Sequence, residues 1–236
     1  MNRKLTAALL VAAAVLTNAA FTVLGSVFDY PDILKQPVAD VLSAFRQNQG
    51  QVTSWFAVMA VSAALFVPIA LGVGRLSTHR AMRLAVPAGI AAGVVQAIGL
   101  SRWPVLVPGF AADAASTDPR TAARGQDAFE TAHLVLGNIV GETFGYLLTA
   151  AWTLLVLTAL HRALAGRWFT VLGAVSAVLV LAGVLSPLDL PVIDTANFVG
   201  YVLWSLWLVV FAVVLLRRPA AATAGRSGHA LTTARG

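Results

Sequence analysis

Six long apolar stretches alternate with polar segments along the 236-residue chain. A helix needs about 20 apolar residues to cross the hydrocarbon layer of a bilayer, and each stretch comes close to that length. The pattern predicts an all-α fold, a polytopic transmembrane helical bundle over residues 1–216, followed by a basic tail over 217–236 that we expect to be disordered. The six spans are expected near 5–25, 52–73, 84–105, 133–160, 168–185 and 197–216.

Two polar segments between the apolar stretches carry helical signals of their own. In the first, residues 26–51, four apolar residues follow the i, i+3, i+4, i+7 spacing of a short amphipathic helix. These residues are Val38, Val41, Leu42 and Phe45. Such a helix either lies at the membrane interface or caps the bundle. In the second segment, the outer loop expected at 109–130, Asp118-Pro119 has the form of a helix start.

The composition restricts the class of protein. Charged residues make up 11% of the chain and hydrophobic residues 58%, and the mean hydropathy is +0.81. Soluble domains carry about 25% charged residues, so an ordinary cytosolic enzyme and a nucleic-acid-binding domain both fit the composition poorly. The chain has no cysteine, which excludes disulfides and zinc–thiolate sites. We expect the lipid bilayer as partner, no nucleic acid, no metal and no cofactor.

The distribution of charge predicts the orientation. Eleven of the 16 Lys and Arg residues lie in the segments on one side of the predicted spans, and nine of the 10 acidic residues lie on the other side. Cytoplasmic segments carry an excess of Lys and Arg, so both termini are expected in the cytoplasm. The first stretch is longer than the apolar core of a signal peptide, and we expect it to remain as a helix.

The fourth stretch combines small and polar residues. Gly137, Gly141 and Gly145 repeat at every fourth position, a spacing that lets another helix approach closely. Beside them, five polar residues are spaced by 4, 4, 3 and 4 positions and therefore share one face of an α-helix. They are Asn138, Glu142, Tyr146, Thr149 and Thr153. Such a stripe is costly against lipid, so it is expected to face the bundle interior.

Glu142 is the one acidic residue that falls within a predicted span. Polar residues on other spans are expected at the same depth, where they complete an outward-facing pocket: Asn18, Gln96, Arg102 and Asn197. Glu142 is either a structural acid, protonated or paired with Arg102, or a functional one.

With α-helical spacing, His133 faces away from Glu142, so Glu130-x-x-His133 is not expected to bind a metal. Trp103 is expected at the outer membrane interface.

Four runs of sequence resemble one family. They are FDYPDILKQPVADVLSAF, AVPAGIAAGVVQAIGLSRWPVLVPG, ETAHLVLGNIVGETFGYLLTAAWT and LDLPVIDTANFVGYVLWSLW. These runs resemble the bacterial multi-pass membrane proteins grouped as domain of unknown function 4386, and the resemblance covers most of residues 5–216. It implies a polytopic helical protein, here expected in the bacterial cytoplasmic membrane, and it implies no particular activity.

Two functions remain in competition. The first is a non-enzymatic protein whose pocket binds a small or lipidic ligand, or a membrane partner. The second is a membrane-embedded enzyme acting on a lipid or isoprenoid, with Glu142 as acid or base and Asn138, Tyr146 and Arg102 orienting the substrate. An enzyme needs two groups of separated proton affinity, and the sequence offers one, which favours the binder. A transporter is disfavoured because the polar residues gather in the outer half of the spans.

Overall fold

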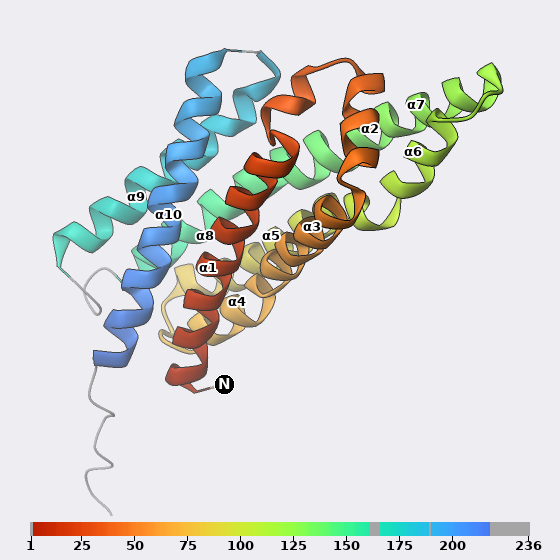
Figure 1. Ribbon diagram of the computed structural model, residues 1–236. Coiled ribbons are helices and arrows are strands. Elements are labelled where there is room, and N and C mark those ends of the chain that lie inside the picture. Colours follow the sequence, from red (N-terminus) through yellow and green to blue (C-terminus); the bar gives the residue numbers. More distant parts are fainter. Residues whose placement is uncertain (1, 161–165, 189, 218–236) are drawn as a thin grey trace, which may run out of the picture.

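The computed structural model describes residues 2–160, 166–188 and 190–217. In these ranges all regular elements are helices, and six helical segments are long and apolar enough to cross a membrane (Figure 1). The all-α prediction and the six predicted spans are therefore confirmed. The tail predicted over 217–236 lies outside the described residues, apart from Arg217.

The six spans are built from shorter helices. In chain order the elements are α1 (Arg3–Phe28), η1 (Asp32–Lys35), α2 (Val38–Gln47), α3 (Gln49–Ala64), α4 (Phe66–Gly74), α5 (Arg80–Val105), α6 (Val107–Ala114), α7 (Pro119–Ala132), η2 (His133–Phe144), α8 (Gly145–Leu160), α9 (Arg167–Ala182), η3 (Gly183–Leu188) and α10 (Pro191–Arg217). The second span breaks between α3 and α4 because Pro68 has no N–H to donate to the carbonyl of Ala64, the last residue of α3.

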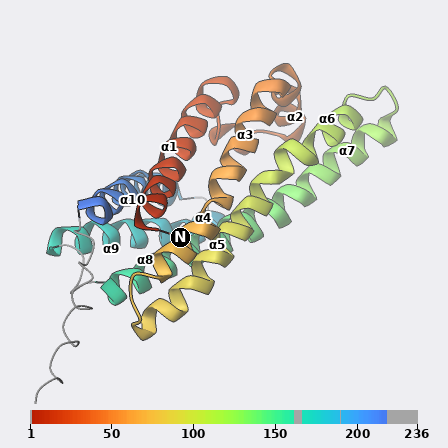
Figure 2. The ribbon, with the colours of Figure 1, turned by 90° about the horizontal axis from the view of Figure 1, so that it is seen from below.

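One hairpin is longer than the rest of the bundle. Its arms are α5–α6 and α7–η2–α8, of 35 and 42 residues. At the rise of an α-helix these arms would measure roughly 50 and 60 Å, whereas a hydrocarbon layer is about 30 Å thick. Figures 1 and 2 show α6 and α7 extending past the other helices. Residues 109–130, expected as an outer loop, are therefore mostly helical.

The remaining helices pack around this hairpin. The α5 helix lies against α3, α4, α8 and η2, and α1 lies between α3 and α10. The α9 helix joins α8 to α10. The α1–α2 connection and the α6–α7 hairpin lie at one end of the bundle, here called the α2 end, while the chain begins at the opposite end (Figure 1).

The amphipathic helix predicted between residues 26 and 51 is α2, and it caps the bundle. Val41, Leu42 and Phe45 are at most 1% exposed and pack into the core of the α2 end. Arg46 fixes α2 to the hairpin, since its Nη1 donates a hydrogen bond of 3.2 Å to the carbonyl of Ala111. The sequence left two positions open for this helix, at the membrane interface or as a cap on the bundle, and in the structure it is the cap.

Trp103 corrects one sequence prediction. It is completely buried instead of lying at the membrane interface. Its ring stacks on Phe56 with centroids 4.6 Å apart, and Phe28 and Phe129 meet it edge-on at 5.3 and 5.8 Å. The sequence-based expectation failed because α2 and α7 continue the core beyond the point where the predicted span ends.

Candidate functional site

Glu142, near the end of η2, lies within electrostatic range of all three tyrosines of the chain. Its charge acts on each of their hydroxyl groups, at Tyr30, Tyr146 and Tyr201. Tyr30 follows α1, Tyr146 stands in the first turn of α8, and Tyr201 is on α10. The rings of Tyr146 and Tyr201 meet edge-on at 5.8 Å. Three stretches far apart in sequence, around Tyr30, Glu142–Tyr146 and Tyr201, thus contribute to one polar cluster near the α2 end.

The carboxylate of Glu142 has no direct partner. In the described part of the chain, no hydrogen bond and no ion pair reaches its oxygens, although the side chain is half-buried. Polar groups removed from water are costly unless they are hydrogen-bonded. The carboxylate is therefore free to accept hydrogen bonds, and it is the chemical centre of the site.

Arg102 lies near Glu142 but is engaged elsewhere. It is 4% exposed, its Nη1 donates a hydrogen bond of 2.5 Å to the carbonyl of Gly99, and its Nη2 lies 3.3 Å from Nδ1 of His133. The opposite charges of Arg102 and Glu142 act on each other, yet no ion pair joins them. The ion pair between Arg102 and Glu142, one of the predicted alternatives, is therefore not formed in the structure.

The position of His133 is a second correction. Residues His133–Phe144 form a π-helix instead of an α-helix, and its i→i+5 hydrogen bonds place more residues in each turn. The α-helical spacing that placed His133 opposite Glu142 does not apply there. Both residues lie near the guanidinium of Arg102. The π-helix is rare, and its single-turn form is frequent at functional sites; the longer π-helical segment here carries Glu142.

The segment Asp29–Gln36, here called the strap, crosses from α1 to the first turn of α10. Burial raises the pKa of Tyr30 to about 12, and the nearby charge of Glu142 adds to the rise. The Tyr30 ring meets Phe56 edge-on at 5.2 Å. Farther along, Nζ of Lys35 lies 3.1 Å from Asp32 and 3.4 Å from Asp194; hydrogen bonds to Asp32 and then Asp194 raise the pKa of Lys35.

Three residues predicted to line the pocket serve as links between helices. Asn18 on α1 donates to Ser205 Oγ of α10 at 2.9 Å, and Gln96 on α5 donates to Thr149 Oγ1 of α8 at 3.0 Å. Asn197 on α10 donates to the carbonyl of Val180 on α9 at 2.8 Å. Their amide groups are thereby occupied. The sequence analysis did not include Lys35 and Tyr201 in the site. The one pattern that could have pointed to Tyr201 is that the tyrosines of the chain lie at a similar depth relative to the predicted spans.

The three predicted packing glycines face α5, where each lies against a different group. A Cβ on Gly137 would stand 2.8 Å from Nη2 of Arg102, and one on Gly145 would stand 2.7 Å from Cγ of Gln96. Gly141 lies against the backbone of Gly99. The absence of side chains at these positions makes room for the guanidinium and for the close approach of η2 to α5.

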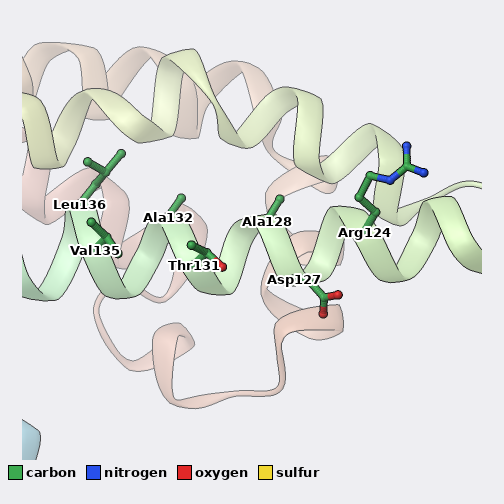
Figure 3. A pocket seen from close by; sticks show the side chains of 7 residues that line it. All are labelled: Arg124, Asp127, Ala128, Thr131, Ala132, Val135 and Leu136. Atoms are coloured by element: carbon green, nitrogen blue, oxygen red, sulfur yellow. The ribbon is translucent and has the colours of Figure 1, made fainter.

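A hollow of about 520 Å³ lies outside this cluster, along α7 and the start of η2. Its lining residues are Arg124, Asp127, Ala128, Thr131, Ala132, Val135 and Leu136. Figure 3 shows these side chains along a single helix, with the Asp127 carboxylate pointing away from the neighbouring helix and Leu136 pointing toward it. The lining is contributed by one helical arm and includes none of the polar residues predicted for the pocket.

The family described as Domain of unknown function (DUF4386) matches residues 5–212. The chain belongs to this family. The resemblance seen in the sequence is thereby confirmed, and the family contributes no activity to the argument. No curated protein and no solved structure matches the chain. What this member of DUF4386 does must therefore be argued from its own residues.

Proposed function

We propose that the protein is a membrane-embedded binding protein whose site, centred on Glu142, holds a small or lipidic ligand. The observation that carries the proposal is the Glu142 carboxylate, which is half-buried, lies within electrostatic range of three tyrosines and has no direct partner in the described part of the chain. Isolated polar groups inside membrane helices are costly and mark functional sites. A ligand that donates a hydrogen bond or a positive charge removes that cost.

The polar groups of the interior support a site that opens to one end. Along α8 beyond Tyr146, Thr153 Oγ1 donates to the carbonyl of Thr149 at 2.8 Å and accepts from Nε1 of Trp204 at 2.9 Å. Beyond them, toward the end where the chain begins, most buried side chains are apolar. Arg102 is the one buried charged residue in the described ranges. A conduit needs polar groups along its full path, so this arrangement favours binding over transport. With the orientation predicted from charge, the site faces the outside of the cytoplasmic membrane.

The test is mass spectrometry of the molecules that co-purify with the protein from its native membrane. Wild type is compared with Glu142→Gln, which keeps the shape and removes the charge. Glu130→Gln is the matched control, because Glu130 is the only other glutamate and is exposed on α7. We expect a species retained by wild type and Glu130→Gln and lost from Glu142→Gln. An identical set of species in all three proteins contradicts the proposal.

One observation supports an enzyme as the second candidate. The hydroxyl groups of Tyr146 and Tyr201 near Glu142 are a second kind of proton-transfer group. The sequence placed Tyr146 on the same face as Glu142, and the structure adds Tyr201. An enzyme would convert a membrane lipid or isoprenoid to a new product that accumulates with time and depends on Glu142. A binder would retain its ligand chemically unchanged.

A further inference from the structure

We propose that a second copy of this chain docks on α7, so that the protein forms a two-fold symmetric dimer. The contact face is the hollow of about 520 Å³ along α7 and the start of η2, here called the α7 face. Three properties of this face carry the proposal: no other element closes it, its middle is made of small side chains, and its two charges are complementary to each other. The proposal goes beyond the proposed function and does not depend on it.

The α7 helix packs on the rest of the molecule with a different face. Gly125 and Phe129 are buried there. A Cβ on Gly125 would stand 2.6 Å from the backbone N of Ala114 on α6, and Phe129 meets Trp103 edge-on at 5.8 Å. Every residue that lines the hollow belongs to the α7–η2 arm, and α6 and α7 extend past the other helices (Figures 1 and 2). In the described part of the chain, the α7 face is therefore left without a helix that closes it.

The middle of the α7 face allows a close approach. It is lined by Ala128, Thr131 and Ala132, with the two charged residues at one end and the apolar Val135 and Leu136 at the other (Figure 3). Ala128 and Ala132 are one helical turn apart, and small residues at this spacing let a second helix come near. Two copies inserted in one membrane have the same orientation, so two α7 helices related by a two-fold axis along the membrane normal meet with the same residues.

The charged end of the α7 face is complementary to itself. Arg124 and Asp127 are exposed, and no hydrogen bond or ion pair reaches either of them within the described ranges. They are three positions apart, which corresponds to about 4.5 Å along the helix. In a parallel pair that crosses at Ala128 and Ala132, Arg124 of each copy comes within reach of Asp127 of the other. A two-fold interface forms each such contact twice, so one patch supplies both ion pairs.

A lipid fits the α7 face less well. The part of the face from Arg124 to Ala132 precedes the span predicted at 133–160, and at the rise of an α-helix Arg124 lies roughly 14 Å beyond the start of that span. Acyl chains fill the hydrocarbon layer that the span crosses. The small residues of the face therefore lie outside the acyl chains, at a level where another protein surface is the natural occupant.

The first test is cysteine crosslinking of the full chain in its native membrane, since the chain has no cysteine of its own. Ala128→Cys and Ala132→Cys, tested separately, carry the thiol in the proposed contact. Glu130→Cys is the matched control, because Glu130 is exposed on α7 but lies roughly 160° around the helix from both alanines. Mild oxidation should link at least one of the two alanine variants into a dimer and leave Glu130→Cys monomeric.

The other outcomes of the crosslinking overturn the proposal. Equal crosslinking of all three variants indicates random collisions, and the absence of a linked dimer in both alanine variants indicates that the α7 faces do not meet. A product that joins the chain to a different protein or a lipid in place of a second copy identifies another occupant.

The second test is a change of charge in chains that carry the linking cysteine. Arg124→Asp leaves two acids on the face, and Asp127→Arg leaves two bases. Each variant alone should dimerise about tenfold more weakly, which corresponds to about 1.4 kcal/mol, because two exposed ion pairs are replaced by repulsion. Co-expressed with different tags, the two variants should form a mixed dimer at the level of wild type, since the acids of one meet the bases of the other.

The double variant Arg124→Asp/Asp127→Arg exchanges the two charges within one chain and should dimerise like wild type. All of these substitutions are at exposed positions, so the fold is expected to persist. Dimerisation that ignores the single charge changes, or a failure of both the mixed pair and the double variant to restore it, overturns the proposal.

Discussion

Gly99 of α5 and Gly141 of η2 lie in backbone contact. A Cβ on Gly99 would stand 2.6 Å from the Cα of Gly141 and 2.7 Å from the carbonyl oxygen of Leu136. The two helices therefore touch at this point without any side chain between them. One turn along α5, this approach holds Arg102 against Gly137 and near Glu142. The arrangement of the site depends on the contact.

Adding a methyl group at this contact should destabilise the bundle. Gly99→Ala forces backbone apart from backbone, and overpacking of this kind costs about 1–3 kcal/mol in the free energy of unfolding. Gly109→Ala on α6 is the control, because a Cβ there meets nothing within 4 Å and alanine favours a helix by roughly 1 kcal/mol. Thermal unfolding in detergent should show a lower Tm for Gly99→Ala and an equal or higher Tm for Gly109→Ala. Equal Tm changes in both variants would contradict the contact.

The orientation predicted from charge is open to a direct test. Thr78, between α4 and α5, and Thr117, between α6 and α7, are exposed at opposite ends of the long hairpin. The chain has no cysteine, so a single cysteine gives an unambiguous signal. In intact cells an impermeant thiol reagent should label Thr117→Cys and leave Thr78→Cys unlabelled, because Lys and Arg mark the cytoplasmic side. The reverse pattern would invert the topology and place the Glu142 site on the cytoplasmic side.

The path of the strap over the first turn of α10 can be checked by crosslinking. The Lys35–Asp194 ion pair is exposed, and such pairs contribute little to stability, so Lys35→Cys/Asp194→Cys should fold normally. A short bifunctional maleimide should join the two cysteines within one chain, seen in mass spectrometry as one linker with both ends reacted. Lys35→Cys/Thr117→Cys is the control pair and should carry two singly attached linkers. Failure to crosslink 35 to 194 would mean that the strap takes another path.

Asp118 should make the start of α7 sensitive to acid. Hydrogen bonds from the hydroxyl and then the backbone N–H of Thr121 hold the pKa of Asp118 below its ordinary value of 3.8. A carboxyl whose pKa is lowered by folding stabilises the helix at neutral pH, and the effect is lost as the pH falls through the lowered pKa. Amide exchange of the first turn, corrected for its intrinsic pH dependence, should rise in acid for wild type. Asp118→Asn, also a good N-cap, should lack this pH dependence while remaining protected.

The spans could be predicted because their cause is local. In lipid each backbone group must be satisfied within its own helix, so a run of about 20 apolar residues is sufficient to predict a crossing. The same local logic found the cap at Asp118, whose side chain accepts from the backbone N–H groups of Arg120 and Thr121. It also located the face of α2 that packs on the bundle. These features need no knowledge of what lies across the molecule.

The site could be predicted only in part. Glu142 and Tyr146 were found from their α-helical spacing, yet that spacing failed for His133 because residues 133–144 adopt a π-helix. The π-helix and the α-helix accept nearly the same residue types, so single residues do not distinguish the two forms. Packing of Gly141 on Gly99 and of Gly137 on Arg102 accompanies the π form, and these contacts join residues about 35 to 42 positions apart.

The sequence by itself determined the helices, the lengths of their apolar runs and the presence of one acid among them, since each depends on neighbours along the chain. Only the tertiary structure decided which partners that acid has. Arg102 contacts Gly99 and His133 and forms no ion pair with Glu142, and Lys35 forms an ion pair with Asp194. Choices of this kind depend on which side chains meet once the helices have packed, and the energy differences between alternative pairings do not appear in the pattern of any single helix.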